Sequence, residues 1–196
     1  MDAPLYFEDL ETGQVWVSPR RTVTESDVIQ FATMTGDFNP LHVDYDFASK
    51  SHYRQPIAHG LLGLSWVAGL GAYFPNVQTL AFTAVREWDF CRPLFFGDTV
   101  YVETTCQELS ASGRRSGKAV WMRKLINQSD QVVQQGLFET LVAIRSAVPR
   151  SHITRQIAQP GLQPQRSSLE SGIEDNRGGL ERTTPVNPSV AEKQSP

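Results

Sequence analysis

Residues 61–74, LLGLSWVAGLGAYF, lie within a long uncharged part of the chain, since no Lys, Arg, Asp or Glu occurs between Gln55 and Val85. Drawn as a helix, this run is apolar nearly all round, and a helix of that kind is buried. Its length of 14 residues falls short of the roughly 20 needed to cross a bilayer. Its glycines suit close packing against a sheet. We therefore predict a core helix over Leu61–Phe74, and no membrane span.

Residues 35–60, immediately before this helix, read TGDFNPLHVDYDFASKSHYRQPIAHG. Pro40 fixes its own φ and biases Asn39 away from helix, so a defined loop is expected from Asp37 to His42. A carboxylate and an imidazole so close in sequence can hold one water between an acceptor and a donor, as general acid/base catalysis requires. The plainer alternative is that Asp37 caps a turn, Asn39 closes an Asx-turn and His42 is an ordinary core histidine.

His59 and Gly60 stand at the start of the predicted helix. There the first backbone N–H groups lack intrahelical partners and the positive end of the helix dipole points outward. Such an end can stabilise an oxyanion. The alternatives are that Gly60 only gives the chain room to turn and that His59 is a hydrogen-bonded cap.

Two runs, FATMTGDFNPLH at 31–42 and PIAHG at 56–60, with Ala48 between them, closely resemble the motif of the MaoC-like dehydratase family. That family includes the (R)-specific enoyl-CoA hydratases. The resemblance extends from about Tyr6 to Ile144 and includes RPLFFGDT at 92–99, which is similar to the family's turn between two strands. It implies an α+β hot dog fold, in which a long antiparallel sheet wraps the central helix.

The resemblance also implies a site and a partner. Carried over by position, Asp37 and His42 would be the catalytic dyad, and the Gly60 N–H would bind the thioester oxygen of an acyl-CoA. His59 would belong with Gly60 to the oxyanion and substrate-binding group. Asn39 is better suited to fixing the loop or orienting water, because an amide does not titrate. The resemblance further implies a homodimer with acyl-CoA tunnels at the subunit interface.

The chain departs from the family at one position. Several family hydratases carry a serine two helical turns beyond the His-Gly pair, where this chain has Ala68. Ser65 lies nearby on the same predicted helix but does not occupy that position.

The remaining elements can be read from periodicity. Thr24 and Asp27 form a capping-box pattern ahead of an apolar face, which predicts a helix over Glu25–Met34, and a short helix is expected over Asp44–Ser51. Alternating apolar residues predict half-buried strands of an antiparallel meander with one solvated face. The alternating sets are Leu80, Phe82, Ala84, Trp88 and Phe90; Val100, Val102 and Thr104; and Phe138, Thr140, Val142 and Ile144. Turns are expected at Gly97-Asp98, Ser112-Gly113 and Asn127–Asp130.

Composition divides the chain into one domain and a tail. Residues 1–147 are long enough to bury a sound core, and we assign them to a MaoC-like hot dog domain. No aromatic residue follows Phe138, and Pro, Ser, Gln, Gly and Arg dominate from Pro149 onward. Residues 148–196 are therefore predicted to be a disordered tail, because they cannot offset their ordering entropy by burial.

Charge and cysteine content exclude several function classes. A net charge of −3 without a basic stripe argues against nucleic acid as a partner. Cys91 and Cys106 fit neither a metal pattern nor a disulfide framework and are expected to be buried thiols. The N-terminal sequence lacks the features of a signal peptide, so a cytoplasmic protein is expected. Weak candidates for meeting CoA phosphates are Arg54, Arg86 and Arg92.

These observations together favour an acyl-CoA hydratase/dehydratase that adds water reversibly across a 2-enoyl thioester and needs neither metal nor cofactor. Asp37 and His42 would handle the water, and the sequence leaves open which is the base and which the acid. Two alternatives stay open. Hot dog folds also host thioesterases, and a noncatalytic acyl-binding protein would retain the motif for its turn alone.

Overall fold

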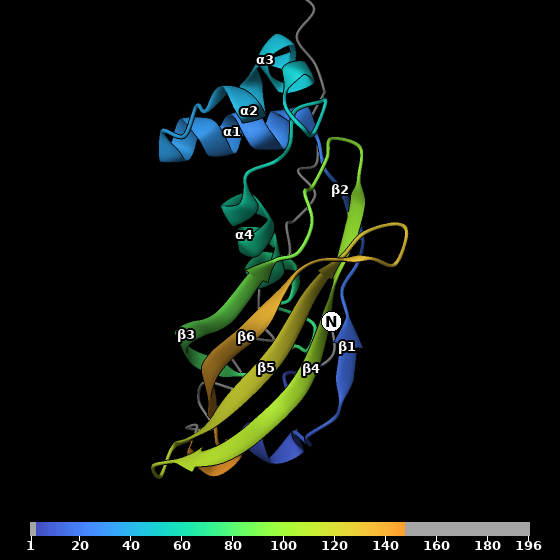
Figure 1. Cartoon of the computed structure of the whole chain (residues 1–196). Helices are drawn as coiled ribbons and strands as arrows, with labels where there is room; N and C mark the ends of the chain where they lie inside the picture. Colours follow the sequence, from blue (N-terminus) through green and yellow to red (C-terminus); the bar gives the residue numbers. More distant parts are fainter. Residues whose placement is uncertain (1–2, 148–196) are drawn as a thin grey trace, which may run out of the picture. The chain divides into compact units, whose positions relative to one another are not determined.

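The structure is a computed structural model that describes residues 3–147. The predicted disordered tail lies outside the described residues. Four α-helices, six strands and two short 3₁₀ helices make up the described part (Figure 1). In chain order they are η1 Phe7–Asp9, β1 Val15–Val17, β2 Arg21–Thr22, α1 Glu25–Thr35, α2 Pro40–Val43, α3 Tyr45–Lys50, α4 Gly60–Leu70, β3 Thr79–Phe90, β4 Thr99–Ser112, β5 Ser116–Ile126, β6 Val132–Ala143 and η2 Arg145–Ala147.

The strands form one antiparallel sheet in the order β1-β4-β5-β6-β3, with β2 also paired to β4. Strands β4, β5 and β6 form a meander, and their connections fall at the predicted turns after Ser112 and Asn127. The predicted meander also included the run at 80–90, joined through the turn at Gly97-Asp98, and this part is wrong because β3 pairs with β6 and not with β4. The predicted α+β class is confirmed. Strand β3 pairs with β6, so β3 lies at one edge of the sheet and β1 at the other (Figure 1).

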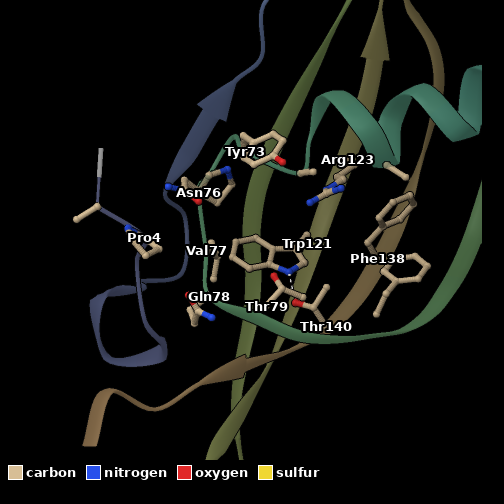
Figure 2. Close-up of a pocket in the computed structure, with 15 residues that line it drawn as sticks. Pro4, Tyr73, Asn76, Val77, Gln78, Thr79, Trp121, Arg123, Phe138 and Thr140 are labelled. Carbon is tan, nitrogen blue, oxygen red and sulfur yellow. Dashed lines mark hydrogen bonds between the residues drawn. The ribbon is translucent and has the colours of Figure 1, made fainter. Parts of the chain in front are cut away.

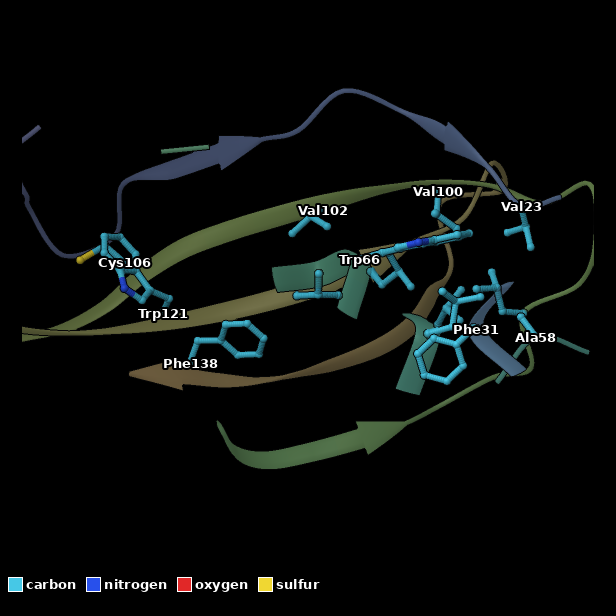
Figure 3. Close-up of a cluster of buried hydrophobic side chains, with 14 of the residues drawn as sticks. Val23, Phe31, Ala58, Trp66, Val100, Val102, Cys106, Trp121 and Phe138 are labelled. Carbon is cyan, nitrogen blue, oxygen red and sulfur yellow. The ribbon is translucent and has the colours of Figure 1, made fainter. Parts of the chain in front are cut away.

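The helix α4 packs one side against the sheet, and its Leu62, Trp66 and Val67 side chains are buried. Figure 3 shows the core around it, with Trp66 between Trp121 at one end of the cluster and Phe31 at the other. The prediction of a core helix is therefore confirmed, but the opposite side is not covered by the described chain, where Leu61 keeps 59% of its surface exposed. The helix also ends at Leu70, four residues earlier than predicted.

The helices before α4 follow from their capping residues. Thr24 and Asp27 exchange the predicted capping-box bonds at the start of α1. Asp44 caps α3, as the predicted short helix required. The expected loop up to His42 is wrong in its second half, because Pro40 begins the four-residue helix α2. The reason is that Pro is favoured at the first position of a helix, where its missing N–H costs nothing.

Two further expectations on burial are wrong. Leu80, Phe82 and Phe90 on β3 are exposed, because β3 is an edge strand whose outer side meets no other described element. Cys91, just after β3, is exposed as well, whereas Cys106 on the central strand β4 is buried as predicted. Both are free thiols.

Candidate active site

The loop after α1 is fixed by two side chains of the predicted motif. Gly36 ends α1 in a left-handed conformation, at φ 81°. Asp37 Oδ1 accepts from the Asn39 N–H at 3.3 Å, and Asn39 Oδ1 accepts from the Leu41 N–H at 3.0 Å to cap α2. Asp37 and Asn39 thus both make the turn hydrogen bonds considered as the plainer alternative. The Asp37 carboxylate still has a free oxygen, because its side chain is 52% exposed and Oδ2 makes no hydrogen bond in the described chain. Oδ2 lies 3.9 Å from His59 Nε2.

His42, on α2, is held in one orientation by the backbone. Its Nδ1 lies 2.7 Å from the Ile57 carbonyl oxygen, which can only accept, so Nδ1 carries the hydrogen and donates. Nε2 is left as an acceptor and makes no hydrogen bond within residues 3–147. Burial lowers the pKa of His42, and the neighbouring His59 lowers it further, against opposing effects of Ile57 and Asp37. The ring is therefore neutral at pH 7 and can accept a proton.

His59 is buried, with 2% of its surface exposed, and ties the motif together. Its Nε2 donates to the Asp37 carbonyl oxygen at 2.9 Å, and its ring lies 3.9 Å from the His42 ring, centroid to centroid. His59 takes the N-cap position of α4, but its side chain caps nothing there. Buried in this way, the ring fixes the backbone of Asp37 to the start of α4 instead of reaching outward.

One ligand atom each from Asp37, His42 and His59 lies within 4.8 Å of the others. A separation of this size between two acceptors suits a single bridging water, with each hydrogen bond about 2.7–2.8 Å long. The same three groups resemble a metal-ligand set, but His42 Nδ1 and His59 Nε2 both bond backbone carbonyls, and His59 Nδ1 is buried. Asp37 Oδ2 and His42 Nε2 remain as the acceptors of this group that make no hydrogen bond within residues 3–147, and they are therefore the candidates to hold a water.

The first turn of α4 leaves two backbone donors free. Leu62 and Gly63 donate to the His59 carbonyl oxygen, whereas the N–H groups of Gly60 and Leu61 find no acceptor among residues 3–147. These N–H groups point out of the positive end of the helix dipole. These two N–H groups are the donors that an oxyanion at this position would use.

Gln134, on β6, anchors this turn and was missed by the sequence analysis. Its Nε2 donates to the Gly60 carbonyl oxygen at 3.0 Å, and its Oε1 accepts from Trp88 Nε1 at 3.3 Å. It reaches the helix because position 63 is glycine, where an added Cβ would lie 2.2 Å from Gln134 Nε2. The available signal was the alternation of β6, which puts a polar residue at 134 on the same inward face as Phe138.

A cavity of about 820 Å³ lies between the second half of α4 and the sheet (Figure 2). It does not include Asp37, His42 or Gly60, but Ala68 of α4 and Phe82 of β3 line it. Ser65 does not take the place of the family serine, because its Oγ donates to the Leu61 carbonyl oxygen at 2.8 Å on the exposed side of α4. The alanine at 68 thus leaves open space where a serine hydroxyl would stand.

The arginines suggested for CoA phosphates differ in their surroundings. Arg86 is paired with Glu139 at 2.6 Å, which makes it a poor phosphate ligand. Arg54 and Arg92 are exposed, and neither side chain forms an ion pair within residues 3–147.

Residues 9–127 match the family described as MaoC like domain. The chain belongs to the MaoC-like family. It is 33% identical over 141 residues to the 3-hydroxybutyryl-CoA dehydratase of Methylorubrum extorquens, covering 71% of this chain and 84% of that protein. It is 32% identical over 148 residues to the (R)-specific enoyl-CoA hydratase of Rhodospirillum rubrum, covering 71% and 93%. Protein MaoC of Klebsiella aerogenes is longer, and this chain spans only 33% of it.

A solved structure supports the fold. A conserved hypothetical protein of Mycobacterium tuberculosis described as a double hot dog fold superposes with a TM-score of 0.65 at 23% identity, covering 74% of this chain and 46% of that one. The hot dog fold expected from the resemblance is confirmed. No helix within residues 3–147 is long and apolar enough to span a membrane.

Proposed function

We propose that this MaoC-like protein is an acyl-CoA hydratase/dehydratase that adds water reversibly across a 2-enoyl thioester. The observation that carries the proposal is the placement of the Asp37 carboxylate and the His42 imidazole within 4.8 Å of each other. The hydrogen bond from His59 to the Asp37 carbonyl oxygen holds the loop that carries Asp37 against the start of α4. One water and one thioester oxygen can thus be bound a short distance apart.

The start of α4 would bind the thioester. With the carbonyl oxygen on the Gly60 N–H, the conjugated system is polarised and C3 becomes electrophilic. The enolate that forms as water adds is stabilised by the same N–H and by the helix dipole. One such donor typically lowers the barrier by about 3 kcal/mol. Gly60 suits this role because its missing side chain leaves the N–H accessible beside the Phe90 ring.

The proton can be followed from water to carbon. At rest His42 is neutral, its Nδ1 hydrogen is committed to Ile57, and an ionised Asp37 can only accept. We therefore assign His42 Nε2 as the base that takes a proton from water while the water oxygen bonds to C3. The C2=C3 electron pair moves into the enolate, and the imidazolium then returns that proton to C2. Asp37 accepts a hydrogen bond from the second O–H of the water, which remains as the product hydroxyl, and stabilises the imidazolium.

A second copy of the chain is the proposed partner along β3. This edge strand carries exposed Leu80, Phe82, Val85 and Phe90. An open strand edge presents unpaired N–H and C=O groups that favour pairing with another chain. We infer a homodimer through β3, which would also cover the exposed side of α4. Leu80→Lys should shift the sedimentation coefficient to that of a monomer, whereas Val15→Lys on the opposite edge should not.

The reaction is tested with purified full-length protein and crotonyl-CoA. We expect loss of the conjugated enoyl absorbance and formation of 3-hydroxybutyryl-CoA, with the (R) configuration on chiral analysis. Release of free CoA thiol while the enoyl absorbance persists would identify a thioesterase instead. Binding without any turnover of a panel of 2-enoyl-CoAs and acyl-CoAs would identify a noncatalytic acyl-binding protein. We propose the cytoplasm as the compartment and an acyl-CoA thioester as the substrate.

A further inference from the structure

Arg123, on β5, is a buried cation at the α4 side of the cavity. It keeps 8% of its surface exposed and lines the cavity. Its Nη1 and Nη2 donate to the Val67 and Gly71 carbonyl oxygens at 3.3 and 3.0 Å, at the end of α4. Figure 2 shows the guanidinium beside α4, between the Trp121 and Phe138 rings, and it lies 4.8 Å from the Phe138 ring centroid.

The charge of Arg123 has no counterion in the described chain. None of the ion pairs within residues 3–147 includes it, and its buried Nε–H has no hydrogen-bond partner there. Burial lowers its pKa to about 10, so the group is still charged at pH 7. The two carbonyls of α4 use two of its five N–H hydrogens. A buried charge is costly unless it is paired, so an anion in this cavity would be stabilised.

Two elements, α4 and β3, contribute residues both to the cavity and to the surroundings of Gly60. On α4, residues 61, 65 and 68 follow one another at helical spacing along the exposed side, and the last of them lines the cavity. On β3, the Phe90 ring lies against Gly60, and Phe82 lines the cavity. A chain that starts at Gly60 and follows α4 along β3 therefore arrives at Arg123.

We propose that the acyl group of the substrate ends in a carboxylate, which Arg123 binds in this cavity. This inference rests on the proposed hydratase function. A carboxylate in the cavity can accept from the N–H hydrogens of Nη1 and Nη2 that the Val67 and Gly71 carbonyls leave unused, a two-bond geometry in which arginine binds carboxylates. The binding would supply the counterion that the described chain lacks.

The helix sets the length of the expected acyl group. Val67 and Gly71 lie 7 and 11 residues beyond Gly60, which corresponds to roughly 11 to 16 Å at about 1.5 Å per residue. Hydrogen bonds of about 3 Å at each end leave roughly 5 to 10 Å for the carbon chain. Extended chains cover about 3.5 Å per three bonds, so the expected substrate is a dicarboxylic 2-enoyl thioester of roughly six to ten carbons.

The test compares two substrates on the unmodified full-length protein. The CoA monothioester of 2-octenedioic acid is measured beside 2-octenoyl-CoA, which has the same chain length and a methyl end. We expect kcat/KM to be at least about tenfold higher for the carboxylated substrate, because its carboxylate can accept charge-assisted hydrogen bonds from Arg123 that a methyl end cannot accept. Equal or higher kcat/KM for the methyl-ended substrate overturns the inference and leaves the proposed hydratase function intact.

Two arginine variants sharpen the result. Arg123→Met should remove the preference, and Arg123→Lys should keep only part of it, because lysine retains the charge but loses the fork. Crotonyl-CoA is too short to reach the cavity, so the kcat/KM of each protein for the two eight-carbon substrates is expressed relative to its own kcat/KM for crotonyl-CoA, which removes any general effect of the substitution. If no 2-enoyl-CoA is hydrated, the proposed function fails. Calorimetric binding of saturated octanoyl-CoA and its ω-carboxylated counterpart then decides on Arg123 alone, since equal affinities overturn the inference.

Discussion

Gln134 offers a test of how the start of α4 is held, and Gln134→Leu is the variant of choice because it nearly preserves volume. The substitution removes the donor to the Gly60 carbonyl oxygen and the acceptor for Trp88 Nε1. Gln134 is only 2% exposed, so water cannot easily replace it. We expect both the stability of the domain and the alignment of the free N–H groups to suffer.

The magnitude follows from the two orphaned groups. A buried polar group left without its partner costs about 1–3 kcal/mol. Gly60 is an exposed residue and Trp88 is half-buried, so the larger share of the cost falls on the Trp88 N–H. We therefore expect a loss of about 2–3 kcal/mol in the free energy of unfolding. Removing an oxyanion donor costs about 100- to 1000-fold in kcat. Because the donor here is only misaligned, we expect a decrease of about 10- to 100-fold.

Urea denaturation and crotonyl-CoA hydration measure the two effects separately. The matched control is Gln107→Leu on β4, an exposed glutamine whose replacement should change stability by less than about 0.5 kcal/mol. Gln134→Leu with unchanged stability and unchanged kcat would refute the anchoring role.

Four further predictions concern the dyad, pH, metals and the tail. Asp37→Asn and His42→Ala should each lower kcat by at least about 100-fold and be markedly non-additive; near-normal turnover of a folded Asp37→Asn protein would leave Asp37 only its turn role. Because burial lowers the pKa of His42, kcat/KM should fall at acid pH with a midpoint below about 6.5. A pH–rate profile of the wild-type protein without this decrease would contradict His42 as the base. The stability contributed by neutral His42 is present above about 6.5 and lost as pH falls through its lowered pKa, which pH-dependent unfolding can follow. Dialysis against a chelator should leave turnover unchanged, and any loss restored by a divalent cation would contradict metal-free chemistry. Truncation after Arg150 should alter neither melting temperature nor kcat, and a large drop in either would mean that the tail docks on the domain.

The site could be predicted from sequence because its parts are close in the chain. Asp37, His42 and Gly60 come from one run of 26 residues, and Pro40 and the caps around it specify the local backbone. The error at α2 had a local cause as well. The loop was inferred from the fixed φ of Pro40 and its effect on Asn39, whereas at the first position of a helix proline itself is favoured.

Gln134 and Arg123 escaped prediction because their roles arise from distant contacts. Gln134 meets Gly60 across 74 positions of sequence, and Arg123 meets Val67 across 56. Periodicity marks the inward face of a strand but does not say which helix that face meets. The same limit explains β3, whose alternation was visible while its place at the sheet edge depended on pairing with β6.

The chain between His42 and Ile57 leaves the site and returns to it, and its two ends are fastened together. Ile57 donates its N–H to the Leu41 carbonyl oxygen at 3.3 Å and accepts from His42 Nδ1 at 2.7 Å. The orientation of His42 in the dyad is therefore set by these two hydrogen bonds at the base of the segment, which we call its neck, and depends little on the residues between them. Residues 44–55, which include α3, should be a permissive place for insertions, a peptide tag or a fluorophore in a working enzyme. In nature, the same neck would let this segment change in length without disturbing the chemistry.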